Sequence, residues 1–226
     1  MNENTLVSKI KYHIAAGADT RVDSMFSKHG AVKASNADNA NLIVYLGGSD
    51  ISPSLYMENE HISTYTNSDL DEKEMNVYYD ALPKGKAQVG ICRGGQLLHC
   101  LAGGWLYQDI DRHNISHEAF TYVGDYTRKT IVTSSHHQAM GDVNCGEVLM
   151  YSPKLATFKE GGSYISEPKG DVVYDIDDET IDIEAMAYPL HNSLSYQPHP
   201  EWSLPKSVGN GCRDLFFTFI NRCLEL

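Results

Sequence analysis

The sequence predicts an α/β fold in which a mixed, mainly parallel sheet is flanked by helices and carries a small antiparallel extension. Residues 41–46 are too short and too β-branched for a helix and are typical of a buried strand. A helical pattern with an acidic first turn follows over residues 70–82, and residues 87–91 form a second short apolar run. Residues 111–190 instead show short alternating segments between polar turns, typical of antiparallel strands. These segments are 129–133, 147–151, 172–176 and 181–187.

The two ends of the chain are expected to complete this sheet and its cover. Residues 9–16 are predicted as a first strand and residues 194–197 as another short strand. A closing helix with one apolar face is predicted over residues 209–226. Residues 18–40 are too weakly patterned to place a full-length helix. Because no repeat, low-complexity segment or linker interrupts the chain, we expect a single domain over residues 1–226.

The composition narrows the classes of partner. The chain has 226 residues, 42% of them hydrophobic, which is enough for a sizeable core. Its 30 acidic and 18 basic residues give a formal charge of −12, so nucleic acid is not an expected partner. The five cysteines include no CxxC pair, which argues against a disulfide framework or a thiolate zinc site. Without a signal-peptide pattern or a bilayer-length apolar run, we expect a cytoplasmic protein with no membrane partner.

Cys92 lies where the apolar run 87–91 meets a helix-like stretch, residues 96–101. Glycines stand two residues before it and two and three residues after it, as in a nucleophile elbow, where a strand turns sharply into a helix. The helix N-terminus favours a thiolate and a developing oxyanion. A buried structural cysteine in a glycine-rich turn explains this stretch equally well.

A catalytic cysteine needs a base and a group that orients the base. Among ten histidines, His199 is distinguished because it follows a predicted strand, has a proline on each side, and is followed two residues later by Glu201. In extended chain that spacing places both side chains on the same side, so the carboxylate can accept the imidazole N–H. A histidine that only caps a strand is the alternative, but it leaves the elbow unexplained.

Five blocks of sequence resemble one family. Residues 90–96 and 197–201 together resemble the paired signature of class I, triad-type glutamine amidotransferases. Residues 47–56 resemble the GG-x-D-x-x-P-x-x-Y loop of the branch that contains γ-glutamyl-γ-aminobutyrate hydrolase and other γ-glutamyl hydrolases. Residues 103–109 resemble its glycine-rich segment, and residues 134–138 its S-x-H-H-Q segment. The resemblance implies a single glutamine amidotransferase-like, flavodoxin-like domain.

The resemblance also implies roles for individual residues. Cys92 is the expected nucleophile, His199 the general base and then the general acid, and Glu201 the group that orients His199. The backbone N–H groups of Gly48 and Arg93 are the expected oxyanion hole. Each such donor typically contributes about a hundredfold or more in rate.

Three further side chains are implied to bind the substrate. Gln96 lies one helical turn beyond the nucleophile, and Ser134 and His136 are expected at the amino-acid end of the substrate. The alternatives are that Gln96 is a helix residue that points to water, and that His136 and His137 form a solvated strand end. His136 and His137 are adjacent in an expected strand and point to opposite faces, so they would not chelate one metal ion. The resemblance implies no metal and no organic cofactor.

The implied reaction is cysteine-dependent hydrolysis of a γ-glutamyl amide through a thioester on Cys92. The substrate is either glutamine, with ammonia passing to a separate synthetase or ligase, or a γ-glutamyl conjugate of an amine or peptide. A non-catalytic binding member of the fold is a competing hypothesis, and so is a redox or chaperone protein with an elbow cysteine. The chain departs from the family near its N-terminus, where only an abbreviated strand–helix–strand segment fits before Leu42.

Overall fold

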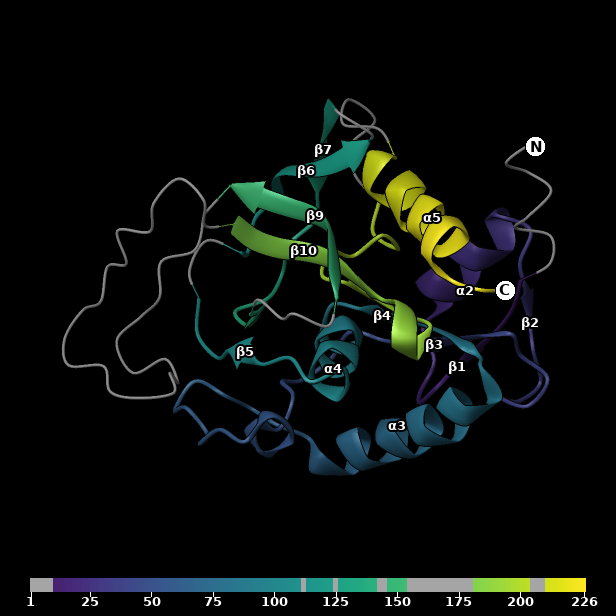
Figure 1. The fold of residues 1–226 in the computed structure, drawn as a ribbon, viewed down its shortest axis with the longest axis horizontal. Helices are drawn as coiled ribbons and strands as arrows, with labels where there is room; N and C mark the ends of the chain where they lie inside the picture. The colour runs from purple at the N-terminus through teal and green to yellow at the C-terminus, as the bar shows by residue number, and fades with distance from the viewer. Residues whose placement is uncertain (1–9, 111–112, 124–125, 142–145, 154–180, 204–209) are drawn as a thin grey trace.

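The structure is a computed structural model that describes residues 10–110, 113–123, 126–141, 146–153, 181–203 and 210–226. In this part of the chain the strands join one mixed sheet in the order β2-β1-β3-β4-β11-β10-β9-β6-β7 (Figure 1). The fold is therefore a mixed α/β fold, as the sequence predicts. The single domain over residues 1–226 stays a prediction.

The first half of the sheet is parallel. Its strands, in spatial order, are β2 (Val32–Lys33), β1 (Lys11–Ile14), β3 (Leu42–Tyr45), β4 (Ala87–Ile91) and β11 (Ser193–Tyr196). The carboxyl ends of neighbouring parallel strands lie at the same edge of the sheet, which is where such folds hold their sites. The residues that follow β3, β4 and β11 therefore meet at one edge.

The second half of the sheet is antiparallel. It continues through β10 (Ile181–Tyr188), β9 (Glu147–Pro153), β6 (His117–Val123) and β7 (Tyr126–Val132). Two short strands, β5 (Leu106–Tyr107) and β8 (Ala139–Met140), pair beside it, and β8 also pairs with β10. This is the expected antiparallel extension, and it forms one sheet with the parallel strands.

Helices cover both faces of the sheet (Figure 1). One face packs against α2 (Thr20–Lys28) and α5 (Gly211–Cys223), and the other against α3 (Ser68–Ala81) and α4 (Arg93–Leu101). Strand β3 shows why both faces are covered: Leu42 and Val44 belong to the first core cluster, Ile43 and Tyr45 to the second, and all four are fully buried. Three short 3-10 helices, at Pro53–Tyr56, Leu82–Lys84 and Pro189–His191, complete the described elements.

Most of the predicted elements are confirmed with shifted ends, and the abbreviated strand–helix–strand segment expected before Leu42 is present as β1, α2 and β2. Helix α2 exists where no full-length helix could be placed; Asp19 caps it by accepting from the N–H groups of Arg21 (2.7 Å) and Val22 (3.4 Å). Its buried stripe contains only three residues, too few to give a clear periodic signal. Helix α4 begins at Arg93, one turn earlier than expected, and the predicted segment 172–176 lies outside the described residues.

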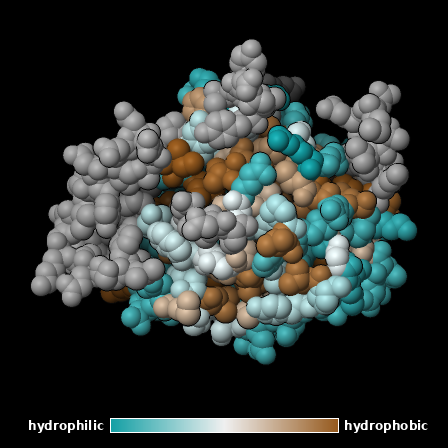
Figure 2. Space-filling view, viewed as in Figure 1, coloured by the Kyte–Doolittle hydropathy of each residue, from teal (hydrophilic) through white to brown (hydrophobic). Residues whose placement is uncertain are grey.

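Figure 2 shows hydrophilic side chains along the lower edge of the molecule in this view, where α3 runs, and more apolar surface toward its middle. Among the residues that the structure describes, no helix is long and apolar enough to cross a membrane.

Candidate active site

Cys92 forms a strained turn between β4 and α4. Its backbone has φ +51° and ψ −112°, a conformation that costs energy for any residue other than glycine. The turn is held from both sides: Cys92 N–H donates to Tyr196 O at 2.8 Å, and Gln96 N–H donates to Cys92 O at 3.0 Å. Cys92 is 6% exposed, at the N-terminus of α4. This is the geometry of a nucleophile elbow.

The glycines around Cys92 are required by close packing. A Cβ at Gly90 would overlap the carbonyl of Gly94, and a Cβ at Gly94 would overlap the carbonyl of Tyr45 in β3. The helix after the cysteine therefore lies directly against the backbone of the sheet. The glycine spacing in the sequence thus reflects how tightly the chain turns at Cys92.

His199 and Glu201 follow β11, and the His199 ring lies beside Cys92. His199 Nδ1 lies 2.7 Å from Glu201 Oε1, and the side chains of His199 and Glu201 are 11% and 4% exposed. Burial acts to lower the pKa of His199, but its hydrogen bonds to Cys92 and to Glu201 outweigh burial and raise that pKa to about 9. A raised pKa favours the imidazolium form of the ring beside the sulfur of Cys92.

Three neighbours hold the backbone and the ring of His199 in place. Thr133 makes a reciprocal pair with the His199 backbone, because its Oγ1 accepts from His199 N–H at 2.8 Å and donates to His199 O at 3.0 Å. Trp202 stacks on the ring, with centroids 4.1 Å apart and an interplanar angle of 8°. A Cβ at Gly47 would lie 3.1 Å from His199 Cε1 and 3.7 Å from Cys92 Cβ, so the Gly47 backbone closes the space beside both side chains.

Gly48 and Arg93 lie against one another beside Cys92. A Cβ at Gly48 would be 3.4 Å from Cδ of Arg93. The Arg93 side chain is buried and pairs with Asp71 and Glu74 of α3. Asp71 also accepts from the backbone N–H of Ser52 at 3.1 Å, which ties the loop after β3 to the elbow. As the first residue of α4, Arg93 has a backbone N–H without an acceptor four residues earlier in the helix, as an oxyanion donor requires.

Gln96 does not point to water. Its side chain is buried, and its Nε2 donates to the Gln138 carbonyl at 3.0 Å and lies 3.2 Å from Gln197 Oε1. The Nε2 of Gln197 in turn lies 3.7 Å from the sulfur of Cys92. Gln96 and Gln197 therefore form an amide pair beside the nucleophile, and contact of Gln96 with substrate stays a prediction.

Ser134 and His136 lie one layer further from Cys92, behind Gln138. Ser134 Oγ donates to the carbonyl of His113, and His136 Nδ1 lies 2.7 Å from the Gln138 carbonyl. Burial lowers the pKa of His136 to about 3, so its ring is neutral. Because the Gln138 carbonyl also accepts from Gln96, the structure links His136 to the amide pair through one shared atom. Direct contact of Ser134 or His136 with substrate stays a prediction.

His136 and His137 do not lie in the expected strand, because β7 ends at Val132 and β8 begins at Ala139. His137 Nε2 lies 3.0 Å from Oδ1 of Asp50, in the loop after β3, whereas His136 is buried against the ring of His113. The two adjacent histidines therefore contact different groups.

Several residues that build this site were not among those predicted from the sequence. Gln197 falls inside a recognised block and Trp202 follows it directly, so both could have been proposed from position alone. Thr133 and the two carboxylates that hold Arg93 carry no local signal, because their roles arise from packing between distant segments.

Comparison with known proteins places the chain in a family. The sequence pattern of the Peptidase C26 family matches residues 25–150, more than half of the chain. The chain belongs to the Peptidase C26 family. The matched part of this Peptidase C26 member contains Cys92, Gly48 and Arg93, whereas His199 and Glu201 lie beyond it.

Two relatives agree with this membership. YvdE of Lactococcus lactis, assigned as a glutamine amidotransferase-like protein, is 33% identical over 123 residues, which cover 46% of this chain and 52% of the relative. Rv2859c of Mycobacterium tuberculosis, assigned as a glutamine amidotransferase, is 32% identical over 133 residues, covering 50% of this chain and 42% of the relative. The chain thus spans about half the length of the curated relatives it matches.

Two solved structures share the fold. A protein of Thermoplasma acidophilum assigned as one subunit of a GMP synthase has a TM-score of 0.58 at 13% identity, covering 95% of this chain and 94% of that one. A glutamine amidotransferase of Thermotoga maritima has a TM-score of 0.55 at 12% identity, covering 96% and 86%. These likenesses show a glutamine amidotransferase-like fold, as the sequence predicts.

Proposed function

We propose that this Peptidase C26 member is a cysteine hydrolase that cleaves a γ-glutamyl amide bond through a γ-glutamyl thioester on Cys92. The observation that carries the proposal is the strained elbow cysteine beside His199, whose imidazolium is held by Glu201 at 2.7 Å. A structural cysteine does not require a strained backbone or a protonated histidine beside it.

In the first half of the reaction, the Cys92 thiolate attacks the γ-carbonyl carbon. The tetrahedral oxyanion accepts hydrogen bonds from the backbone N–H groups of Gly48 and Arg93, at the positive end of α4. His199 donates its proton to the departing nitrogen, the C–N bond breaks, and ammonia or an amine leaves. The acyl group remains on sulfur as a thioester, and His199 is then neutral.

In the second half, His199 removes a proton from water as the water oxygen attacks the thioester carbonyl. The C–S bond breaks, glutamate leaves, and the thiolate–imidazolium pair of Cys92 and His199 is restored. Glu201 keeps Nδ1 protonated throughout, so that Nε2 is the nitrogen that exchanges the proton with sulfur, amine and water.

The substrate specificity of this proposal rests on the amide groups near Cys92. Gln96 Nε2 donates to Gln197 Oε1 at 3.2 Å, and Gln197 Nε2 lies 3.7 Å from the sulfur, so two carboxamides border the position where the substrate amide would be attacked. Beyond them, Ser134 and His136 are proposed to line the amino-acid end of the pocket.

A second candidate is a glutaminase subunit that passes ammonia to a separate synthetase or ligase. The likeness to a structure assigned as a GMP synthase subunit supports it, because that name describes one part of a larger synthase. The two candidates use the same residues and differ in whether hydrolysis needs a partner protein.

Glutamate release tests both candidates. Wild type, Cys92→Ala and the matched control Cys223→Ala are incubated with L-glutamine and with γ-glutamyl amines, and glutamate is quantified. We expect release by wild type and by the control, and a loss of about a thousandfold or more in Cys92→Ala. Release from glutamine only when a synthetase partner is added selects the subunit function. No release under any of these conditions, or release that persists in Cys92→Ala, refutes the proposal.

A further inference from the structure

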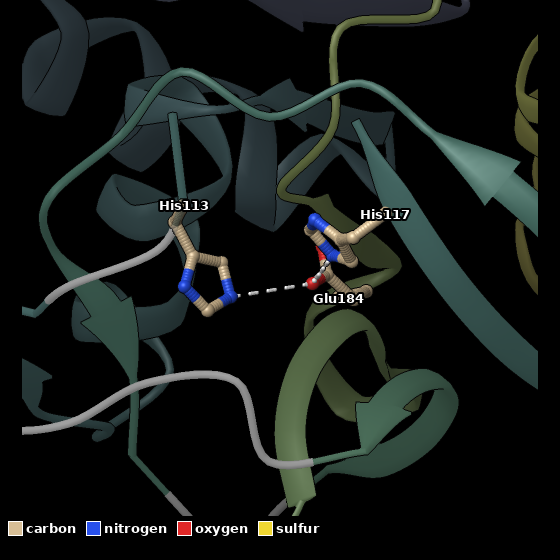
Figure 3. Close-up of side chains that lie close together, drawn as sticks. All are labelled: His113, His117 and Glu184. Atoms are coloured by element: carbon tan, nitrogen blue, oxygen red, sulfur yellow. Dashed lines mark hydrogen bonds and ion pairs between the residues drawn. The ribbon is translucent and has the colours of Figure 1, made fainter. Parts of the chain in front are cut away.

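A second group of chemically active side chains lies away from Cys92. His113, His117 and Glu184 converge in the interior, and their potential ligand atoms all lie within 4.8 Å of one another (Figure 3). His117 Nε2 is 2.7 Å and His113 Nε2 is 3.7 Å from the same carboxylate oxygen, Glu184 Oε1. All three residues are at most 7% exposed. The proposed hydrolysis uses none of them.

Their orientation is set by surrounding hydrogen bonds. His117 Nδ1 lies 3.2 Å from the Ile115 carbonyl, and its Nε2 lies 2.7 Å from Glu184 Oε1. One ring nitrogen is therefore held by the backbone while the other faces the carboxylate. A histidine that donates one N–H to a backbone carbonyl and presents the other nitrogen inward is the usual arrangement at a metal site.

The carboxylate is also supported from its far side. Ser152 Oγ of β9 donates to Glu184 Oε1 at 3.0 Å. Within the part of the chain that the structure describes, Glu184 Oε2 has no hydrogen-bond partner although it is buried. A buried oxygen without a partner is costly, and a divalent ion bound by the carboxylate can supply that partner.

The backbone around the three side chains is held by hydrogen bonds to neighbouring segments. Glu184 lies inside β10, and its carbonyl accepts from Gln197 N–H at 2.8 Å. The carbonyl of His113 accepts from His136 N–H at 3.1 Å, and the ring of His136 lies 4.7 Å from that of His113, centroid to centroid. His136 Nε2 is buried and has no hydrogen-bond partner among the described residues. It is therefore a further unused nitrogen beside the cluster.

We propose that His113, His117 and Glu184 bind one divalent transition-metal ion, with zinc as the best match to two imidazoles and a carboxylate. Bond lengths of about 2.0–2.2 Å in a tetrahedral site separate ligand atoms by about 3.3 Å, and the two distances to Glu184 Oε1 bracket that value. Water fills the remaining position. Asp182, with Oδ2 3.6 Å from His113 Nε2, adds negative charge nearby.

The proposed metal site is linked by hydrogen bonds to the amide pair of Gln96 and Gln197. His136 holds the Gln138 carbonyl, which in turn accepts from Gln96, and Glu184 holds the backbone of Gln197. A metal that fixes this layer would stabilise the fold and hold the amide pair in place. It would take no part in the chemistry at Cys92.

The test uses purified protein in the Cys92→Ala background, which removes thiolate binding at the elbow and makes the result independent of any hydrolytic activity. Metal-stripped protein is titrated with ZnCl₂ against a chromophoric chelator. The variants are Glu184→Gln and His117→Gln, with His61→Gln as a matched histidine control outside the cluster. Far-ultraviolet circular dichroism verifies that each metal-free variant is folded.

We expect one zinc per chain in the background protein and in His61→Gln, together with a higher melting temperature. Each cluster variant should bind about a hundredfold more weakly or worse, because even outer partners of metal ligands cost about 10- to 100-fold. Cobalt loading of the background protein should give visible d–d bands without a sulfur charge-transfer band, even if the variants fail to fold. No stoichiometric zinc, or equal affinity in folded cluster variants, overturns the proposal in favour of a metal-free hydrogen-bonded cluster.

Discussion

Replacing Glu201 by glutamine tests how the candidate site activates its nucleophile. The change keeps the size of the side chain and removes the charge that lies 2.7 Å from His199 Nδ1. The pKa of His199 rises from 6.5 to about 9 through its hydrogen bonds to Cys92 and Glu201. That rise is worth about 3 kcal/mol in favour of the imidazolium, at about 1.36 kcal/mol per unit. Glu201 is one of the two hydrogen-bond partners that raise this pKa, so its loss should lower the pKa of His199 by about one unit.

The expected consequence is a less reactive thiol. A weaker imidazolium stabilises the Cys92 thiolate less, so the alkylation rate of Cys92 at about pH 6.5 should fall about tenfold in Glu201→Gln. The matched control is Glu118→Gln, which removes a carboxylate that is 51% exposed and pairs with Lys129.

The assay is iodoacetamide alkylation as a function of pH, with peptide mapping to separate Cys92 from the other four cysteines. Cys100 and Cys212 are buried, and burial raises their thiol pKa values, so they should react slowly in folded protein. This readout needs no substrate. An alkylation profile for Glu201→Gln that matches wild type and Glu118→Gln would refute the role given to Glu201.

Three further predictions concern stability. Arg93→Leu leaves two buried carboxylates of α3 without their partner, so it should lower the free energy of unfolding, measured by chemical denaturation, by about 3–5 kcal/mol. The control Arg21→Leu changes a side chain that is 59% exposed and should cost less than about 1 kcal/mol. Gly94→Ala forces a Cβ into the neighbouring backbone and should cost about 3 kcal/mol or more; Gly17→Ala, with φ +74° but open space, should cost only about 1–2 kcal/mol. Because the pKa of His199 is raised, the contribution of the protonated ring to the free energy of unfolding is complete below pH 6.5 and is lost as pH rises through about 9. His199→Gln should therefore flatten the dependence of the free energy of unfolding on pH in this range. An equal loss of stability in Arg93→Leu and Arg21→Leu, or in Gly94→Ala and Gly17→Ala, would contradict the packing assigned to Arg93 or Gly94. A pH dependence that is unchanged in His199→Gln would contradict the role given to the protonated ring.

The nucleophile, base and orienting residue could be predicted because each carries a local signal. The strained turn at Cys92 demands glycines at fixed spacing, and the prolines around His199 predict an extended chain with Glu201 on the same side. The structure confirms the turn at Cys92. It corrects the extended chain, because Trp202 N–H donates to His199 O at 3.2 Å and closes a turn, and the contact between His199 and Glu201 forms within this turn. The catalytic roles themselves stay predictions.

Other features could not be predicted because they depend on packing between distant segments. The Arg93 backbone was assigned a role from its place after Cys92, but nothing local indicates that its side chain is buried against α3. Helix α2 was missed because its buried stripe is short and its stability depends on packing and on the Asp19 cap. The approach of Glu184 to His117 is set by the strand order of the antiparallel half of the sheet, which no local pattern specifies.

The central claim is a γ-glutamyl thioester on Cys92, and the most direct measurement is intact-protein and peptide mass spectrometry of enzyme quenched in acid during turnover. The account predicts a single γ-glutamyl adduct that maps to the peptide containing Cys92, is released by hydroxylamine, and is absent from Cys92→Ala. Glutamate release by wild type without any adduct under single-turnover conditions, or an adduct on another residue, would contradict it.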